Sequence, residues 1–239
     1  MRWAGAIKNA FSFITILPVG GWVEDVPISD VFVMFPVVGL LLGISMYAAA
    51  WLFNGIGALV ALAMWVLVTG AFHLDGLADT FDALAVGRER SERLKIMKDP
   101  HLGTFGAVAV LIVLLFKLRC LEVLSANFWI LPPVLGRLAL VAVAFWAAPA
   151  RKEGLGYLVT SNVDLQVFLK ASFISFIVSL FFGLVGLVSF IVALFLSWVL
   201  SLFYTNRFGG ITGDTLGASC ELVETVILAL LAVFRGAVH

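Results

Sequence analysis

The chain has 239 residues, of which 62% are hydrophobic and only 13% are charged, and its formal net charge at pH 7 is +0. Soluble domains carry about 25% charged residues, so this composition excludes an ordinary soluble domain. The zero net charge gives no bulk attraction to nucleic acid, and the two cysteines have no metal-binding spacing. We therefore predict an all-α, polytopic membrane bundle that forms a single integral membrane domain over residues 1–239.

Apolar segments predict the helices in chain order. Residues 1–23 contain a basic start and a short apolar run that Pro18 ends, so we predict a retained interfacial helix rather than a cleaved signal peptide. Spanning helices are predicted over residues 31–53, 56–72, 105–121 and 129–150, and two more over 171–206, divided at Gly183 or Gly186. Residues 222–238 either span or re-enter. The total is about six or seven membrane-spanning helices.

The basic residues predict the orientation of the chain in the cytoplasmic membrane. With the N-terminus in the cytoplasm, alternating spans place most lysines and arginines on the cytoplasmic side, whereas Lys117, Arg119 and Arg235 fall opposite. Lys117 and Arg119 lie near the end of a predicted span and are expected to snorkel to its surface. The same alternation brings segments 73–103, 151–162 and 205–221 to the cytoplasmic face. Because these segments hold most of the carboxylates, we predict the functional site there.

The stretch "HLDGLADTFDAL", residues 73–84, places three carboxylates directly after a segment without charge. Asp75, Asp79 and Asp82 are spaced at i, i+4 and i+7, so a helix carries them on one face. Like charges repel, and their burial is costly unless a cation lies among them. Hard oxygen ligands suit Mg²⁺, so we favour a metal site over a solvated acidic face. His73 is either a base or phosphate contact, or a structural histidine.

The stretch "RFGGITGDTLGASCELVE", residues 207–224, combines glycines with acidic residues at helical spacing. Glycines allow close approach of a ligand or tight turning, and a helix start offers backbone N–H groups to an anion. Packing by small residues explains some of the glycines but not the acidic face. We therefore predict a functional site with substrate contacts at Gly209, Gly210 and Gly213.

The basic segment between these two stretches, "GRERSERLKIMKDPHLGTFG" at 87–106, is alone typical of a cytoplasmic loop attracted to anionic lipid. Beside two acidic clusters, its cations and a metal would together neutralise a pyrophosphate. Lys98 and Asp99, the pair closest to the next helix, are the predicted substrate contacts within it. Arg151, in "ARKEGLG", is predicted to lie at the entrance of the same functional site, together with Glu153. Arg137, a charged residue inside a predicted span, is a further predicted substrate contact.

The segments "FHLDGLADTFDAL", "RLKIMKDPHLGTFG", "RKEGLG" and "GGITGDTLGASCELVE" resemble the cobalamin synthase family, also called adenosylcobinamide-GDP ribazoletransferases. The resemblance runs nearly from end to end and includes the early "SFITILPV" and "FPVVGLLLG". It implies a membrane enzyme that joins adenosylcobinamide-GDP to α-ribazole, or to its 5′-phosphate, and releases GMP with Mg²⁺. Where relatives often carry "KDSR", this chain has Lys98-Asp99-Pro100-His101, and Ala83 stands where relatives often have glycine.

The residue pattern and the resemblance together predict a mechanism. The predicted ligands of the Mg²⁺ that bridges the pyrophosphate are Asp75, Asp79, Asp82 and Asp214. The 5′-hydroxyl of the ribazole attacks the phosphorus on the cobinamide side, in line with the GMP leaving group. Asp82 and Glu221 are both candidates to accept the hydroxyl proton, and the sequence does not choose between them. His73 is the third catalytic candidate.

Two other functions share parts of this residue pattern. A CDP-alcohol phosphotransferase also uses membrane-end aspartates for Mg²⁺, but its usual pattern has an Ala-Arg pair where this chain has Thr80-Phe81. An ion-coupled transporter commonly shows paired repeats or broken helices in corresponding halves, and neither is visible in the sequence. The predicted partners are the two substrates and the lipid bilayer, with no nucleic acid. A homo-oligomer and association with other corrinoid-pathway enzymes both stay open.

Overall fold

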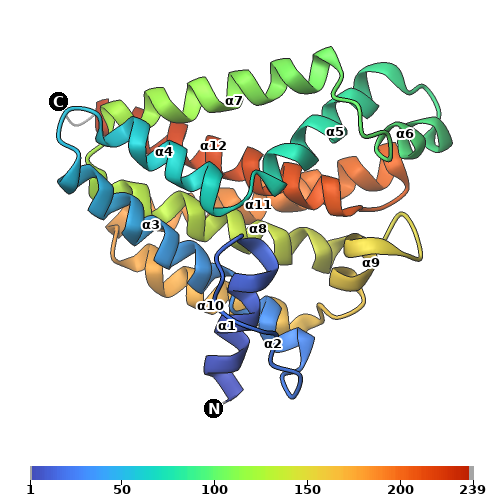
Figure 1. The fold of residues 1–239 in the computed structure, drawn as a ribbon, viewed down its shortest axis with the longest axis horizontal. Coiled ribbons are helices and arrows are strands. Elements are labelled where there is room, and N and C mark those ends of the chain that lie inside the picture. Colours follow the sequence, from blue (N-terminus) through green and yellow to red (C-terminus); the bar gives the residue numbers. More distant parts are fainter. Residues whose placement is uncertain (1, 237–239) are drawn as a thin grey trace.

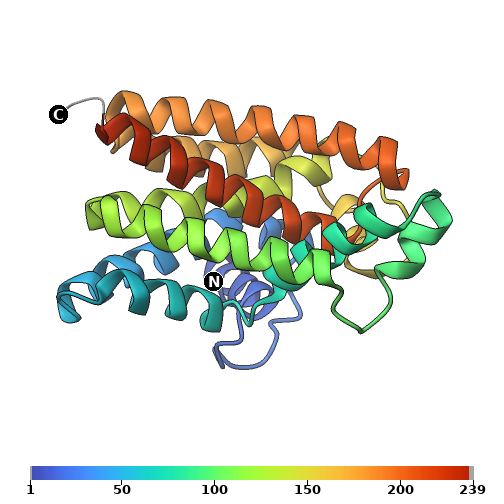
Figure 2. The ribbon, with the colours of Figure 1, turned by 90° about the horizontal axis from the view of Figure 1, so that it is seen from above.

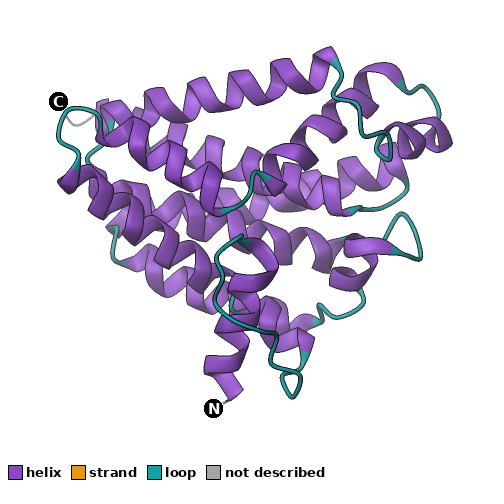
Figure 3. Ribbon diagram, viewed as in Figure 1, coloured by secondary structure: helices purple, strands orange, loops and turns teal. Residues whose placement is uncertain are grey.

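The computed structural model describes residues 2–236, and within that range the chain is built of helices joined by short connections (Figures 1 and 3). The α-helices are α1 (Arg2–Ile14), α2 (Ile28–Val33), α3 (Phe35–Leu52), α4 (Gly57–Val68), α5 (Phe72–Val86), α6 (Arg90–Ile96), α7 (Thr104–Val123), α8 (Leu131–Trp146), α9 (Gly154–Thr160), α10 (Leu165–Leu180), α11 (Gly183–Phe208) and α12 (Gly213–Gly236). A 3₁₀ helix, η1 (Ala126–Ile130), precedes α8. The all-α prediction is confirmed.

Five helical segments in the described range are long and apolar enough to cross a membrane: Ile28–Leu52, Thr104–Val123, Ala126–Trp146, Gly183–Phe208 and Gly213–Phe234. The number rises to seven if each of two bent pairs counts as one span: α4 with α5, bent by 81°, and α9 with α10, bent by 91°. The protein is therefore a multi-pass membrane protein, and the predicted six or seven spans fall within this range.

Helix α8 forms the centre of the bundle and packs against α3, α10, α11 and α12. Small residues let the neighbouring helix approach closely. A Cβ atom at Gly43 of α3 would lie 2.6 Å from the Cα of Ile130, and one at Gly39 would lie 2.7 Å from the carbonyl carbon of Pro133. Membrane helices pack through such residues because lipid supplies no hydrophobic drive between them. A charged side chain on this central helix is consequently enclosed by protein.

The three polar segments predicted to converge do meet, at the end of the bundle where α6 and α9 lie (Figures 1 and 2). Arginine side chains connect them through backbone carbonyls. Arg90 donates to Ala150 O (3.1 Å), Arg93 donates to Arg207 O (3.0 Å), and Arg151 donates to Leu94 O (2.6 Å). The turn between α3 and α4 lies at the opposite end of the bundle. Which membrane face each end occupies stays a prediction.

The prediction for Lys117 is wrong. This lysine does not snorkel to the surface but is 2% exposed and forms ion pairs inside the bundle. Arg119, two residues later, is exposed as expected. The Arg235 side chain and residues 237 and 238 of the predicted last segment lie outside the described part of the chain. Helix α1 buries small residues such as Ala6 and Ala10 and exposes Trp3, a pattern suited to the predicted interfacial helix.

Candidate active site

The site begins at the bend between α4 and α5. Gly70 (φ 60°) and Ala71 (φ 56°) both adopt the left-handed conformation, which is uncommon for a residue with a side chain. These two residues redirect the chain so that α5 starts at Phe72, at an angle of 81° to α4. Asp75 then lies in the first turn of α5, where the free backbone N–H groups favour a negative charge.

Two glycines bring α5 and α12 into backbone contact. A Cβ atom at Gly76 would lie 2.6 Å from the carbonyl oxygen of Asp214, and one at Gly217 would lie 3.2 Å from the Cα of His73. Glycine in "HLDGLADT" therefore serves helix packing. This close approach of the two helices also places the carboxylates of α5 beside Asp214, in the first turn of α12.

The grouped carboxylates outnumber the cations near them in the described part of the chain. Asp75 is exposed, Asp79 and Asp214 are partly buried, and Asp79 interacts electrostatically with Asp214, Asp75 and Asp82. Within residues 2–236, neither Asp75 nor Asp79 forms an ion pair. Asp214 accepts a hydrogen bond from Thr212 Oγ1 (3.2 Å) and lies within electrostatic range of Arg151. An excess of negative charge at one place makes this a candidate site for a cation and an anionic substrate together.

The donor chemistry fits Mg²⁺, but a complete protein cage is not assembled. In the described residues, no group of three or more His, Cys, Asp or Glu side chains is placed to hold a metal ion. Mg²⁺ usually keeps several waters and is bound through one or two carboxylates plus substrate phosphates, rather than by a cage of protein ligands. The residues therefore fit an ion shared with substrate, and the predicted set of four protein ligands stays a prediction.

Asp82 has a structural use that the sequence did not reveal. Its two carboxylate oxygens accept hydrogen bonds from the backbone N–H groups of Gly103 and Gly106, each at 2.8 Å. These groups belong to the start of α7, so Asp82 caps that helix from α5, where an anion is favoured. The side chain is 7% exposed. Its predicted roles as metal ligand and base stay untested, and both would compete with this cap.

Two cavities meet at Gly213, Asp214 and Leu155. The larger, of about 400 Å³, is lined by His73 and Asp75 as well as by apolar residues from α1, α3, α5 and α8. The smaller, of about 220 Å³, is lined by Arg151 and Glu153. His73 is 6% exposed, and its Nδ1 atom has no hydrogen-bond partner among the described residues. Of the predicted glycine contacts, Gly213 is the one that lines both cavities.

The predicted polar contacts at the mouth lie at the rim of the smaller cavity. Lys98 Nζ contacts Glu153 Oε1 at 3.0 Å, and this exposed ion pair lowers the pKa of Glu153. The pKa of Asp99 is also lowered, because the ring Nδ1 of His101 (2.6 Å) and its backbone N–H (3.0 Å) both contact the Asp99 carboxylate. Lys98 and Glu153 therefore share one mouth as predicted, whereas Asp99 is engaged by His101.

Two of the predicted glycine contacts face protein rather than open space. Gly209 (φ 73°) ends α11 in the left-handed conformation, and a side chain there would collide with the Arg90 guanidinium. At Gly210 (φ 143°), a Cβ atom would lie 2.7 Å from the backbone nitrogen of Ala150. Their absent side chains thus allow the polar segments to pack together. Their predicted contacts with substrate stay untested.

Arg137 and Glu221 are not brought to the cavities. They lie in a buried network in which Lys117 contacts Glu221 (2.7 Å) and Glu224 (2.5 Å), and Arg137 pairs with Glu224. Lys117 also lies over the Trp65 ring, 4.3 Å from its centroid. The predictions that Arg137 contacts substrate and that Glu221 takes a proton are untested, but both side chains are already paired.

Sequence reasoning missed Lys117 and Glu224 as a buried pair. A usable signal was present, because Lys117, Arg137 and Glu224 fall within predicted spans, where unpaired charge is expensive, and Glu221 directly precedes one. The four charges balance one another. We therefore assign this network, defined by Lys117, Arg137, Glu221 and Glu224, to the stability of the bundle.

Comparison with known proteins gives the family. Residues 6–232 match the family model described as cobalamin-5-phosphate synthase. The chain belongs to this family. Among curated relatives named adenosylcobinamide-GDP ribazoletransferase, the protein of Alkaliphilus metalliredigens is 36% identical (96% of this chain, 95% of the relative). The relative of Pseudomonas aeruginosa strain PAO1 is 37% identical (93% and 96%), and that of Roseiflexus sp. strain RS-1 is 37% identical (94% and 88%).

No solved structure matches the chain. The cobalamin-5-phosphate synthase match covers both acidic segments and the basic segment between them. The resemblance noted from the motifs is thereby confirmed at the level of family.

Proposed function

We propose that this chain is a Mg²⁺-dependent adenosylcobinamide-GDP ribazoletransferase, which joins adenosylcobinamide-GDP to α-ribazole or its 5′-phosphate and releases GMP. The family and the names of the relatives support the reaction. The observation that carries the assignment to this site is the position of Asp75 and Asp214 in the lining of the larger of two adjoining cavities, with Asp79 in electrostatic contact with both. A site for two substrates and a divalent cation needs that combination.

The acidic and basic residues of the site have different proposed roles. Asp75, Asp79 and Asp214 would hold Mg²⁺, which when bound supplies a Lewis acid for the charge on the pyrophosphate. Lys98 and Arg151 at the rim of the smaller cavity would bind the diphosphate oxygens. In-line attack by the ribose hydroxyl and departure of GMP then depend mainly on positioning, as in other phosphoryl transfers.

The three catalytic candidates differ in what they already contact. Asp82 accepts two backbone hydrogen bonds, and Glu221 pairs with Lys117. His73 lines the larger cavity, and its Nδ1 atom has no hydrogen-bond partner in the described part of the chain. We therefore propose His73 as the side chain that hydrogen-bonds the attacking hydroxyl and orients it.

The assay of purified protein in lipid vesicles tests the reaction. With adenosylcobinamide-GDP, α-ribazole and Mg²⁺, we expect GMP release in proportion to a new corrinoid product, and none after chelation of the metal. Parallel reactions with α-ribazole 5′-phosphate measure which nucleophile is preferred. Release of CMP from a CDP-alcohol lipid, with no GMP from the corrinoid, would instead support the rival phosphotransferase.

We also propose that the site faces the cytoplasm and that the chain lies in the cytoplasmic membrane. Eight of the fifteen lysines and arginines belong to the segments at the end of the bundle that carries the site, as the positive-inside rule expects of the cytoplasmic end: Arg88, Arg90, Arg93, Lys95, Lys98, Arg151, Lys152 and Arg207. Ala85 and Thr205 are exposed there, while Cys120 and Cys220 are buried. Single cysteines at Ala85 and Thr205, in a chain without native cysteines, should both be labelled from the cytoplasmic side. Labelling from opposite sides would refute this topology.

A further inference from the structure

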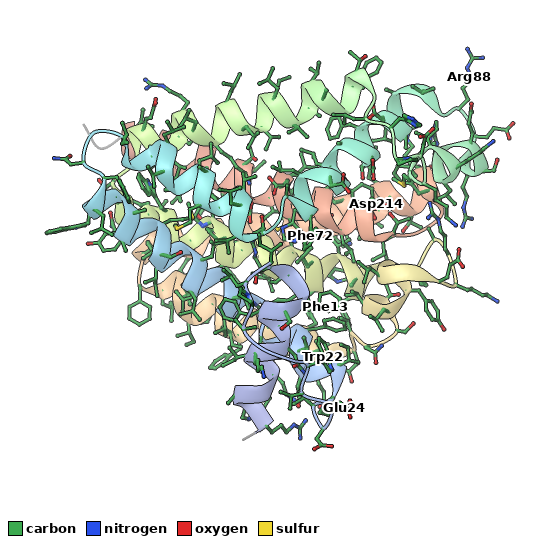
Figure 4. The ribbon with its side chains drawn as sticks, in the orientation of Figure 1. Phe13, Trp22, Glu24, Phe72, Arg88 and Asp214 are labelled. Carbon is green, nitrogen blue, oxygen red and sulfur yellow. The ribbon has the colours of Figure 1, made fainter. Side chains whose placement is uncertain are left out.

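The two adjoining cavities differ in their walls. The larger one has an aromatic wall formed by Phe13 of α1, Phe35 of α3 and Phe72 of α5. The Phe13 ring is fixed against its neighbours, with ring centroids 5.7 Å from Phe32 and 5.6 Å from Phe35. Figure 4 shows Phe13, Phe72 and Asp214 in the middle of the molecule, whereas Arg88 lies at its edge. The aromatic wall therefore belongs to the same cavity as Asp75 and Asp214.

The smaller cavity has a different chemistry. Its lining includes Arg151, Glu153 and Thr212, and Lys98 lies beside it through its ion pair with Glu153. Cationic and hydroxyl groups suit phosphate oxygens, and no aromatic ring lines this cavity. Because both cavities include Asp214 and Gly213, groups bound in the two cavities would meet at that edge.

We propose that the larger cavity is the binding site for the nucleophile, and that its aromatic wall receives the planar azole base of the ribazole. The nucleophile's hydroxyl would then lie toward Asp214, while the diphosphate of the corrinoid substrate approaches from the smaller cavity. This inference rests on the proposed function and extends it, because it says which substrate occupies which cavity.

Size supports this division. A volume of about 400 Å³ lies in the range of roughly 300–1,000 Å³ that buries a drug-sized molecule. A ribosylated base has that size, whereas a corrinoid macrocycle bearing a nucleotide is several times larger. The corrinoid ring must therefore stay outside, and only its diphosphate arm enters the site.

Phe72 is the side chain best placed to select an aromatic base. It is 54% exposed, lines the larger cavity, and directly precedes His73. None of the ring pairs among the described residues involves it, and its exposure leaves the ring accessible to a ligand. Phe81 provides a matched control, because it lies on the same helix, is 36% exposed and does not line either cavity.

The test compares Phe72→Leu, Phe72→Tyr and Phe81→Leu in steady-state kinetics. Loss of an aromatic contact should raise KM for α-ribazole roughly three- to tenfold in Phe72→Leu, equivalent to about 0.7–1.4 kcal/mol at 1.4 kcal/mol per decade. KM for adenosylcobinamide-GDP should not change. Phe72→Tyr keeps the ring and Phe81→Leu lies outside the cavity, so both should retain the wild-type KM for α-ribazole. Calorimetric binding of α-ribazole without the corrinoid should show the same order.

The outcomes separate this inference from the function on which it rests. A raised KM for the corrinoid instead of α-ribazole, or equal changes in Phe72→Leu and Phe81→Leu, would overturn the assignment of the cavity while leaving the reaction intact. Absence of GMP release by the wild-type protein with either nucleophile would overturn the proposed function itself. If Phe72→Leu fails to fold, a wild-type KM in Phe72→Tyr with weakened binding in Phe13→Leu supports the aromatic wall, and unchanged binding in Phe13→Leu opposes it.

Discussion

The protein carries two clusters of charged residues that are built in opposite ways. In the buried network, Lys117 and Arg137 balance Glu221 and Glu224, and all four residues are at most 5% exposed. At the other cluster, Asp75 and Asp214 line the larger cavity, Asp79 interacts electrostatically with both, and Asp214 lies within range of the partly buried Arg151. Asp75 and Asp79 form no ion pair within the described range.

This difference indicates that the buried network stabilises the bundle, whereas the unbalanced carboxylates are available for binding and catalysis. Charges that satisfy one another inside a bundle hold helices together and leave nothing for a ligand. Charges that remain unbalanced beside a cavity are tolerable only with water, a cation or a cationic substrate group. Substitutions in the two clusters should therefore affect different measurements.

Breaking the buried network should have the largest effect. Glu224→Gln removes the partner of both Lys117 and Arg137 and leaves cations without full compensation. We expect a loss of about 3–5 kcal/mol in the free energy of unfolding, measured by denaturant titration in detergent. The control is Glu122→Gln, which removes the exposed pair with Arg119 and should cost little. Equal losses in the two variants would contradict the comparison.

Neutralising the unbalanced cluster should affect turnover instead. Asp75→Asn, Asp79→Asn and Asp214→Asn each remove an anionic oxygen at nearly constant shape. We expect kcat to fall roughly a hundredfold or more and the Mg²⁺ requirement to rise, because even outer-shell changes at metal sites cost about 10–100-fold. Thermal unfolding should change little. The exposed Asp25→Asn serves as control. Wild-type activity with an unchanged Mg²⁺ requirement in all three variants would mean that these carboxylates are merely solvated.

Substitution of Lys98, at the rim of the smaller cavity, should reduce activity less than substitution of the aspartates. Lys98→Gln should lower kcat/KM for adenosylcobinamide-GDP roughly ten- to a hundredfold if Lys98 contacts the diphosphate. Arg88→Gln should do little, because Arg88 is exposed and lies at the edge of the molecule (Figure 4). Arg90 is a poor control, since its guanidinium donates to Ala150 O. Equal effects of Lys98→Gln and Arg88→Gln that vanish at high salt would indicate diffuse electrostatics.

Substitution of Asp82 tests whether this residue has a structural role, as a helix cap, or a catalytic one. Asp82→Asn keeps one acceptor for the start of α7 and loses the other, so we expect a loss of stability of about 1–2 kcal/mol. If capping is its role, the folded variant should keep most of its kcat in initial-rate assays. A collapse of kcat with unchanged unfolding would restore Asp82 as metal ligand or base.

The sequence by itself determined the membrane class, most of the helices and the location of the polar segments. Long apolar runs report spans because a bilayer demands about 20 such residues, whatever the tertiary contacts are. The spacing of Asp75, Asp79 and Asp82 likewise placed them on one helical face, since the helix period is local. The motifs around these residues were enough to indicate the family.

Only the tertiary structure decided which charges are free. Lys117 pairs with Glu221 and Glu224 across 104 and 107 residues, and Asp82 accepts hydrogen bonds from Gly103 and Gly106 at the start of another helix. Helical periodicity carries no information about such partners, because they depend on which helix faces which and at what distance. The distance between α5 and α12, for example, depends on Gly76 and Gly217, because the absence of side chains at these positions lets the two helices touch. This contact places Asp75 and Asp214 in the lining of one cavity, which no local pattern of residues could specify.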